Sequence, residues 1–205
     1  MSREGERLAR SQQQPIVGGL PAFPGILTAI RLTPGLGVHL RGLADELLVN
    51  DFPGATLSRA EREMLATAVS AANDCFYCMD THGAFATALL EQNGATDIEP
   101  LIAGIKDGRS DGVSPKVRAL FQVVRTVRRE ARALTGDDVE KALAAGATDG
   151  DVQLAVLIAS AFSMYNRIVE GFRAGTPGNI DAYRARALEI AAHGYSDQRV
   201  KSVPG

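Results

Sequence analysis

Apolar residues recur along this chain at spacings of three and four residues, which is the pattern of amphipathic helices. No segment of alternating apolar and polar residues interrupts it. The sequence therefore predicts an all-α fold, a compact bundle of about seven or eight helices joined by short loops. In residues 35–50 the predicted apolar stripe consists of Val38, Leu40, Leu43, Leu47 and Leu48.

Capping residues mark where the predicted helices begin. Ser58 precedes Glu61 by three residues, the spacing of a capping box in which each side chain binds the other's backbone N–H. Further starts are predicted at Thr96, Ser114, Thr135 and Thr148. The segment after Thr148, DVQLAVLIASAFSMYNRIVEGF, is nearly apolar and is predicted to be the central buried helix, ending at Pro177-Gly178.

The two ends of the chain differ from its middle. Residues 1–14 are polar and are expected to form a loose, flexible tail, and residues 196–205 form a second polar tail. Residues 15–195 are predicted to be a single helical domain. Its first part, PIVGGLPAFPGIL, is interrupted by proline and glycine and is expected to lie as an arm over the body.

Composition narrows the function classes. The chain has 205 residues, 45% of them hydrophobic, which is enough for one filled core. A net charge of -2 and a pI near 5.9 argue against nucleic acid or an anionic membrane as partners. The polar N-terminus does not resemble a signal peptide, so a cytoplasmic location is expected. In that reducing compartment two cysteines suggest redox chemistry, metal binding or two merely buried thiols.

The candidate chemistry lies between residues 63 and 82. Cys75 and Cys78 form a C-x-x-C pair, and His82 follows four residues later. On a helix these spacings place all three side chains on one stripe. The first cysteine then lies beside the helix start, where the positive end of the dipole favours a thiolate. Lowering a thiol pKa by ~1.5 units requires about 2 kcal/mol of electrostatic stabilisation.

Glu63 joins this stripe only if the chain turns back on itself. Twelve residues of continuous helix would separate it from Cys75 by about 18 Å. A turn, and an N-cap for the next helix, is predicted at Asn73-Asp74. The resulting antiparallel helices bring Glu63 to the height of His82. Glu63 then orients or charges His82, which exchanges a proton with Cys78.

Other interpretations of these residues remain open. Cys75, Cys78, His82 and Glu63 also make up a possible zinc ligand set, although three ligands on one helix stripe fit tetrahedral coordination poorly. We predict no metal and no other cofactor. Asn166, at the end of the apolar stretch, is a candidate pocket residue, with helix capping or a subunit contact as the favoured interpretation.

The segments LSRAEREMLATAVSAANDCFYCMDTHGA and FSMYNRIVEGF resemble the alkyl hydroperoxidase D (AhpD) family of the carboxymuconolactone decarboxylase-like superfamily. The likeness is greatest to its peroxidase-related branch and covers about residues 20–195. It implies a cysteine peroxidase or thiol–disulfide oxidoreductase. In such an enzyme Cys78 attacks the peroxide and becomes a sulfenic acid, and Cys75 condenses with it to a disulfide. Glu63 and His82 would serve as the proton relay.

The resemblance also implies binding partners, and this sequence departs from the family at one position between the cysteines. A small alkyl hydroperoxide, a thiol reductant or redox protein, and assembly into a trimer or hexamer are expected. The best-known family member has a histidine between its cysteines. Here Tyr77 occupies that place as a second pocket candidate; it cannot take up a proton at neutral pH but can donate a hydrogen bond. A non-catalytic redox sensor or helical assembly protein using the same disulfide is the alternative function.

Overall fold

A computed structural model describes residues 3–20, 23–177, 179 and 181–196, and within these residues every regular element is a helix. The all-α prediction is confirmed, although the described residues form ten α-helices instead of seven or eight. Their bounds are α1 Arg3–Ser11, α2 Ile26–Leu32, α3 Pro34–Leu48, α4 Arg59–Ala72, α5 Phe76–Gln92, α6 Ile98–Lys106, α7 Pro115–Arg129, α8 Gly136–Ala144, α9 Asp149–Phe172 and α10 Asp181–His193, with a 3-10 turn, η1, at Ala131–Ala133.

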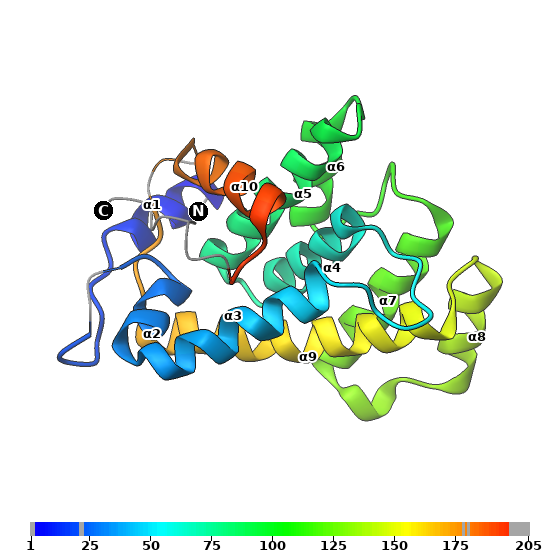
Figure 1. The fold of residues 1–205 in the computed structure, drawn as a ribbon, viewed down its shortest axis with the longest axis horizontal. Coiled ribbons are helices and arrows are strands. Elements are labelled where there is room, and N and C mark those ends of the chain that lie inside the picture. The colour runs from blue at the N-terminus through cyan, green and yellow to red at the C-terminus, as the bar shows by residue number, and fades with distance from the viewer. Residues whose placement is uncertain (1–2, 21–22, 178, 180, 197–205) are drawn as a thin grey trace.

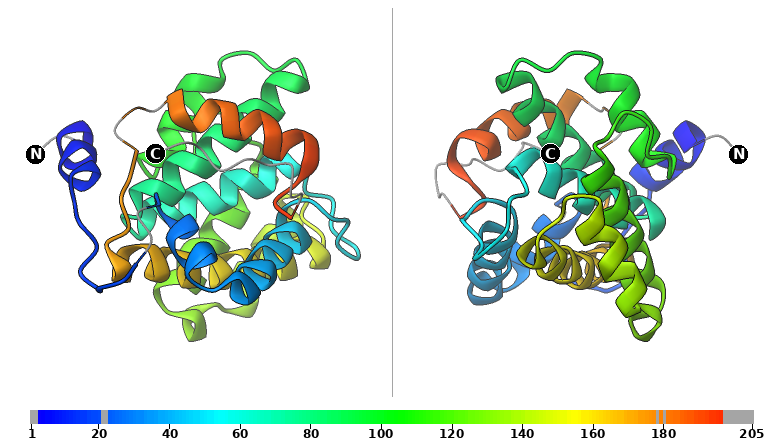
Figure 2. Two further views of the ribbon diagram at one scale, coloured as in Figure 1. Left: turned by 60° about the vertical axis from the view of Figure 1, so that its left-hand side comes forward. Right: turned by 90° about the vertical axis from the view of Figure 1, so that its right-hand side faces the viewer.

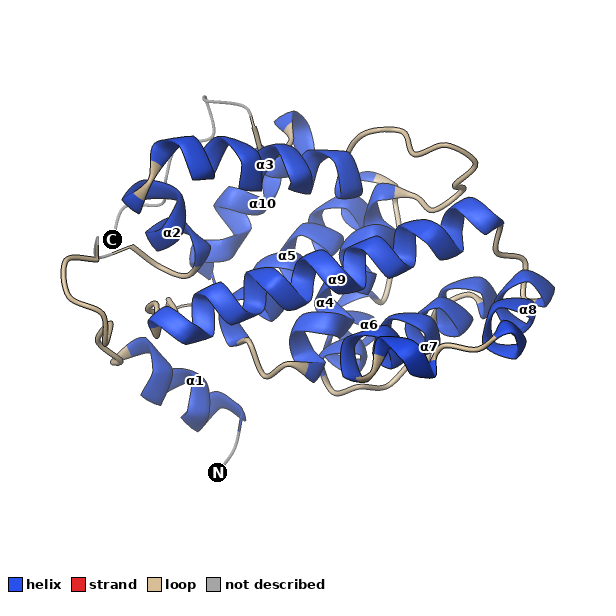
Figure 3. Ribbon diagram, turned by 90° about the horizontal axis from the view of Figure 1, so that it is seen from below, coloured by secondary structure: helices blue, strands red, loops and turns tan. Residues whose placement is uncertain are grey.

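The antiparallel pair α4 and α5 forms the centre of the bundle (Figure 1). Helix α4 packs against α5, α7 and α9, while α5 also contacts α6 and α10. The long helix α9 runs nearly the length of the molecule (Figure 3), and α2 and α3 also pack against it. The helix pair predicted to carry the candidate chemistry is therefore enclosed by the other helices.

Helix α9 is the predicted core helix, with small differences. It is long and apolar enough to cross a membrane, yet 56% of its most apolar window is buried inside the fold, as in a core helix. It ends at Phe172, where Arg173 adopts a left-handed conformation with φ 50°. The helix therefore stops five residues before Pro177; Gly178 lies outside the described residues.

Most predicted helix starts are confirmed. Ser58, Thr135 and Thr148 each form a capping box, and Ser114 caps α7. The predicted start at Thr96 is wrong. Asp97 occupies the N-cap of α6 instead, at φ 55° and without a side-chain cap hydrogen bond. In this left-handed conformation Asp97 itself makes the turn into the helix, which leaves Thr96 outside.

The buried face of α3 is rotated from the predicted one. Leu40, Leu47 and Leu48 are buried, but Val38 and Leu43 are 62% and 38% exposed. Gly37 and Ala44 complete the buried stripe instead. Glycine is needed at position 37, because a Cβ there would lie 2.7 Å from the carbonyl oxygen of Ile30. The close approach of α2 turns α3 so that small residues face inward.

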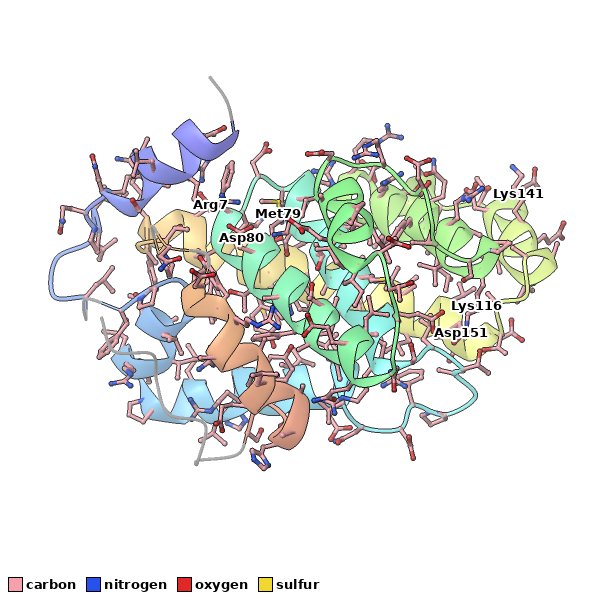
Figure 4. The ribbon with its side chains drawn as sticks, turned by 90° about the horizontal axis from the view of Figure 1, so that it is seen from above. Arg7, Met79, Asp80, Lys116, Lys141 and Asp151 are labelled. Atoms are coloured by element: carbon pink, nitrogen blue, oxygen red, sulfur yellow. The ribbon has the colours of Figure 1, made fainter. Side chains whose placement is uncertain are left out.

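The predicted loose N-terminal tail is also corrected, because α1 occupies most of it. Arg7 donates to the buried Asp80 carboxylate at 2.7 and 3.1 Å, and Lys106 donates to the same group at 2.8 Å. Arg10 pairs with Glu170. Figure 2 shows α1 beside the bundle, and Figure 4 shows Arg7 next to Asp80. These ion pairs hold the nine-residue helix α1 against the bundle. Residues 197–205 of the other tail lie outside the described residues.

Asp151 at the start of α9 carries a prediction about stability. Its carboxylate accepts from the backbone N–H groups of Thr56, Leu57 and Thr148 at 2.6–3.1 Å, and from the Thr56 hydroxyl. Asp151→Asn should lower the free energy of unfolding by about 2–4 kcal/mol, since an amide cannot accept all of these bonds. Chemical denaturation will measure this. Asp138→Asn, in the exposed capping box of α8, is the matched control with a smaller loss expected.

The Asp151 carboxylate also predicts that the stability of the fold depends on pH in the acid range. Burial by itself raises the pKa of Asp151, but the hydrogen bonds from Thr148, Thr56 and Leu57 outweigh it and hold the pKa below its usual value. This stabilisation is complete above the ordinary carboxyl pKa and is lost as the pH falls through the lower pKa of the folded state. A stability difference between Asp151→Asn and wild type that did not shrink in acid would contradict this assignment.

Candidate functional site

The site begins at the turn between α4 and α5. Asn73 ends α4, Asp74 adopts the left-handed conformation at φ 53°, and Cys75 is the N-cap of α5. The turn prediction is confirmed, but the N-cap is Cys75 and not Asp74, because Asp74 is used to reverse the chain. Cys75 and Cys78 therefore lie at the positive end of the α5 dipole.

Antiparallel packing brings Glu63 and His82 together as predicted. The Nδ1 atom of His82 lies 2.7 Å from Oε2 of Glu63. Both side chains are buried, with residue exposures of 1% for Glu63 and 9% for His82. With Nδ1–H donated to the carboxylate, Nε2 of the imidazole is the nitrogen left to accept a proton.

A third residue, Tyr195, completes this group and was not predicted. Its hydroxyl donates to Oε1 of Glu63 at 2.5 Å and lies 3.4 Å from Nδ1 of His82. Burial first, and the neighbouring Glu63 charge second, raise the pKa of Tyr195 well above its usual value. The hydroxyl therefore stays protonated, and the Glu63 carboxylate accepts from both Tyr195 and His82.

The turn after α10 holds Tyr195 in place. Asp45 of α3 accepts from the backbone N–H of Tyr195 at 2.6 Å and of Ser196 at 2.8 Å. Gly194 makes the turn at φ 75°, and a Cβ there would meet the Asp45 carboxylate at 2.8 Å. A Gly-Tyr pair just after a helix was the only signal in the sequence, and it does not indicate which carboxylate the tyrosine reaches.

The two cysteines are both free and buried. The pKa of Cys75 is raised, first by its hydrogen bond to Cys78, then by burial and by the Cys78 charge. The raised pKa favours the thiol form of Cys75 in the reduced pair.

A cavity of about 60 Å³ reaches the second cysteine. Among the predicted site residues Tyr77, Cys78 and His82 line it, whereas Cys75 and Glu63 do not. Its full lining is Ile26, Ile30, Leu40, Arg41, Ala44, Tyr77, Cys78, Thr81, His82, Phe85, Phe162, Tyr165, Arg186 and Tyr195. A small apolar molecule in this cavity would meet Cys78 and the imidazole at once.

The two pocket candidates have different surroundings. Tyr77 is 4% exposed, and burial, partly offset by the Arg186 charge, raises its pKa to about 12. Gly25 packs on its ring, where a Cβ would lie only 2.1 Å away. Asn166 is not part of the cavity lining. It accepts from Asn73 at 2.9 Å and donates to Ser70 at 3.1 Å, tying α9 to the α4–α5 turn.

Over the part of the chain that the structure describes, no group of three or more His, Cys, Asp or Glu side chains is arranged to hold a metal ion. The Glu63 carboxylate faces Tyr195 and His82. It accepts one hydrogen bond from each of them.

Comparisons with known proteins agree with this fold. Residues 41–126, which include the C-x-x-C pair, match the model of the Carboxymuconolactone decarboxylase family. An uncharacterized peroxidase-related protein from Silicibacter sp. TM1040 is similar in structure, with a TM-score of 0.62 and 23% identity over 74% of this chain and 75% of that one. The alkylhydroperoxidase AhpD core of an uncharacterized peroxidase-related protein from Ralstonia eutropha JMP134 has a TM-score of 0.66 and 24% identity over 80% and 81%. No functionally curated protein matches.

Proposed function

We propose that this chain, which matches the Carboxymuconolactone decarboxylase family over residues 41–126 and shares its fold with an AhpD core, is a cysteine peroxidase that reduces small alkyl hydroperoxides. The observation that carries the proposal is the hydrogen-bonded group of Glu63, His82 and Tyr195 beside a cavity lined by Cys78. A buried carboxylate and imidazole next to a cysteine pair form a proton relay for thiol chemistry.

In the first step Nε2 of His82 takes the proton of the Cys78 thiol. The thiolate attacks the terminal peroxide oxygen, so that an S–O bond forms and the O–O bond breaks. The leaving alkoxide recovers the proton from His82 and departs as the alcohol. The hydroperoxide is thereby reduced, and Cys78 is oxidised to a sulfenic acid.

The raised pKa of Cys75 keeps this thiol protonated while Cys78 reacts with the peroxide. In the second step Cys75 loses its proton and the thiolate attacks the sulfenic sulfur, so that an S–S bond forms and the S–O bond breaks. The leaving hydroxide takes up the proton and departs as water. An external dithiol then reduces the disulfide and is itself oxidised, which restores both thiols. The cycle needs no metal or organic cofactor.

The proposal also covers the location, the reductant and the oligomeric state of the enzyme. A reducing cytoplasm would supply the thiol reductant or redox protein, and the net charge of -2 favours neither nucleic acid nor anionic membranes as partners. Leu36, Val38 and Leu43 of α3 are 46%, 62% and 38% exposed. This apolar surface supports a homo-oligomer, a trimer or hexamer in the family resembled.

Stopped-flow mixing of reduced protein with tert-butyl hydroperoxide tests the proposal. Thiol loss much faster than for free cysteine is expected, with mass spectrometry showing one intramolecular disulfide per chain. A rate no faster than free cysteine would contradict the peroxidase. A disulfide that forms slowly and changes oligomer size would point to a redox sensor.

Tyr195 gives a prediction about positioning. Tyr195→Phe keeps the ring but removes one of the two donors to Glu63. The reaction of Cys78 with hydroperoxide should slow about tenfold, and the pH profile of its rate should change, because the relay then lacks one hydrogen bond. Tyr183→Phe is the matched control: this tyrosine of α10 is also buried, and its hydroxyl has no partner among the described residues. An equal loss of rate in Tyr195→Phe and Tyr183→Phe would exclude a positioning role for Tyr195.

A further inference from the structure

Two arginines line the cavity that reaches Cys78. Arg41 comes from α3 and Arg186 from α10, and both are partly buried. Most of the other lining residues are aliphatic or aromatic, among them Ile26, Leu40 and Phe162. A cavity for simple alkyl hydroperoxides requires no charge, so two guanidinium groups in its lining need a separate explanation.

Neither arginine is neutralised within the described residues. Among these residues, no hydrogen bond or ion pair joins Arg41 or Arg186 to a carboxylate, and the buried Nε of Arg186 has no hydrogen-bond partner. Both guanidinium groups nevertheless belong to residues that line the cavity. Their unpaired positive charges are therefore the feature that an anionic ligand in the cavity would meet.

The neighbouring carboxylates are occupied elsewhere. Glu63 accepts from Tyr195 and His82, Asp45 accepts from the backbone after α10, and Asp80 binds Arg7 and Lys106. The Arg186 charge also opposes the effect of burial on the pKa of both Tyr77 and Tyr195, which is consistent with its facing the cavity wall. Both positive charges are thus available to something inside the cavity.

We propose that the preferred substrates are short alkyl hydroperoxides that carry a carboxylate, which Arg41 and Arg186 bind while the hydroperoxide lies at Cys78. The inference rests on the proposed peroxidase function and adds its substrate class. The apolar lining takes the carbon chain, and charge-assisted hydrogen bonds from the guanidinium groups take the carboxylate. A cavity volume of about 60 Å³ favours the shortest such chains.

A matched pair of hydroperoxides tests this. The probes are 4-hydroperoxy-4-methylpentanoate and its methyl ester, which differ in charge but share the reacting group. The second-order rate constant for thiol loss should be about 10- to 100-fold larger for the acid than for the ester, as expected for hydrogen bonds to a charged group. In Arg186→Gln and Arg41→Gln this ratio should fall towards one. Arg167→Gln, an exposed arginine of α9, should keep the wild-type ratio.

Two results would overturn the inference. One is a ratio near one in wild type. The other is an Arg186→Gln variant that slows both probes equally, since the arginine would then act on the thiolate and not on the substrate. If neither probe reacts in a Cys78-dependent manner, the peroxidase function itself fails.

Calorimetry with the unreactive 4,4-dimethylpentanoate separates these failures. Wild type should bind this carboxylate, and Arg186→Gln should bind it at least about tenfold more weakly. Absence of binding to wild type would contradict the carboxylate site even if the enzyme reduces neutral peroxides. Binding that depends on Arg186 would support a carboxylate site in the cavity, and the rate ratio of the two probes then decides whether the peroxidase uses it.

Discussion

Protein carrying Cys78→Ser is expected to reduce hydroperoxide about 1000-fold more slowly than wild type, or not at all. A serine hydroxyl is a far weaker nucleophile than a thiol, and Cys78 is the cysteine that lines the cavity. Peroxide consumption in the presence of excess dithiol measures the loss. Unchanged thermal unfolding would show that the variant is folded, since serine differs from cysteine by one buried atom.

Cys75→Ser is the paired variant with a different outcome. Cys78 should still react with one equivalent of hydroperoxide, but the sulfenic acid should then persist, because no resolving thiol remains. Labelling with dimedone and mass measurement would detect it on Cys78. If Cys75→Ser abolished the first step and Cys78→Ser did not, the two roles would be exchanged.

Glu63→Gln is expected to have the second largest effect. The carboxylate accepts from Tyr195 at 2.5 Å and from His82 at 2.7 Å, whereas an amide offers one oxygen and turns N–H groups towards a donor. The rate of sulfenic acid formation should fall about 100-fold or more, since His82 loses the group that fixes its tautomer. The free energy of unfolding should fall by about 1–3 kcal/mol, because buried donors lose an ionised acceptor.

Glu61→Gln provides the control on the same helix. Glu61 lies near the surface of α4 and serves the Ser58 capping box, a role that glutamine also fills. Its activity should match wild type. A similar loss of rate in Glu61→Gln and Glu63→Gln would mean that helix stability, and not the relay, accounts for the effect.

Several features of the site follow from local sequence alone. The i, i+3 and i+7 spacing of Cys75, Cys78 and His82 fixes one helix stripe, and the Ser58 capping box fixes where α4 begins. The Asn73-Asp74 turn then sets the register of α4 against α5. The Glu63–His82 contact depends only on these short-range elements, and it is present as predicted.

The wrong predictions concern features that are set by packing between residues far apart in the sequence. Val38 and Leu43 were predicted to be buried, but the close contact of Gly37 with α2 turns them outward. The first residues were predicted to be loose, yet Arg7 reaches a carboxylate buried 73 positions away in the sequence. A helical period gives the width of an apolar face but does not identify the neighbouring element that covers it.

The sequence by itself determined the all-helical fold, the turn that pairs Glu63 with His82, and the cysteines as the candidate reactive groups. Only the tertiary structure decided that Tyr195 binds Glu63 across 132 positions, that Cys78 faces a cavity, and that Arg41 and Arg186 line it. The physical reason is distance along the chain. Helix caps and turns are fixed by contacts within a few residues, whereas a cavity is formed by side chains from helices that meet only when the whole bundle has folded.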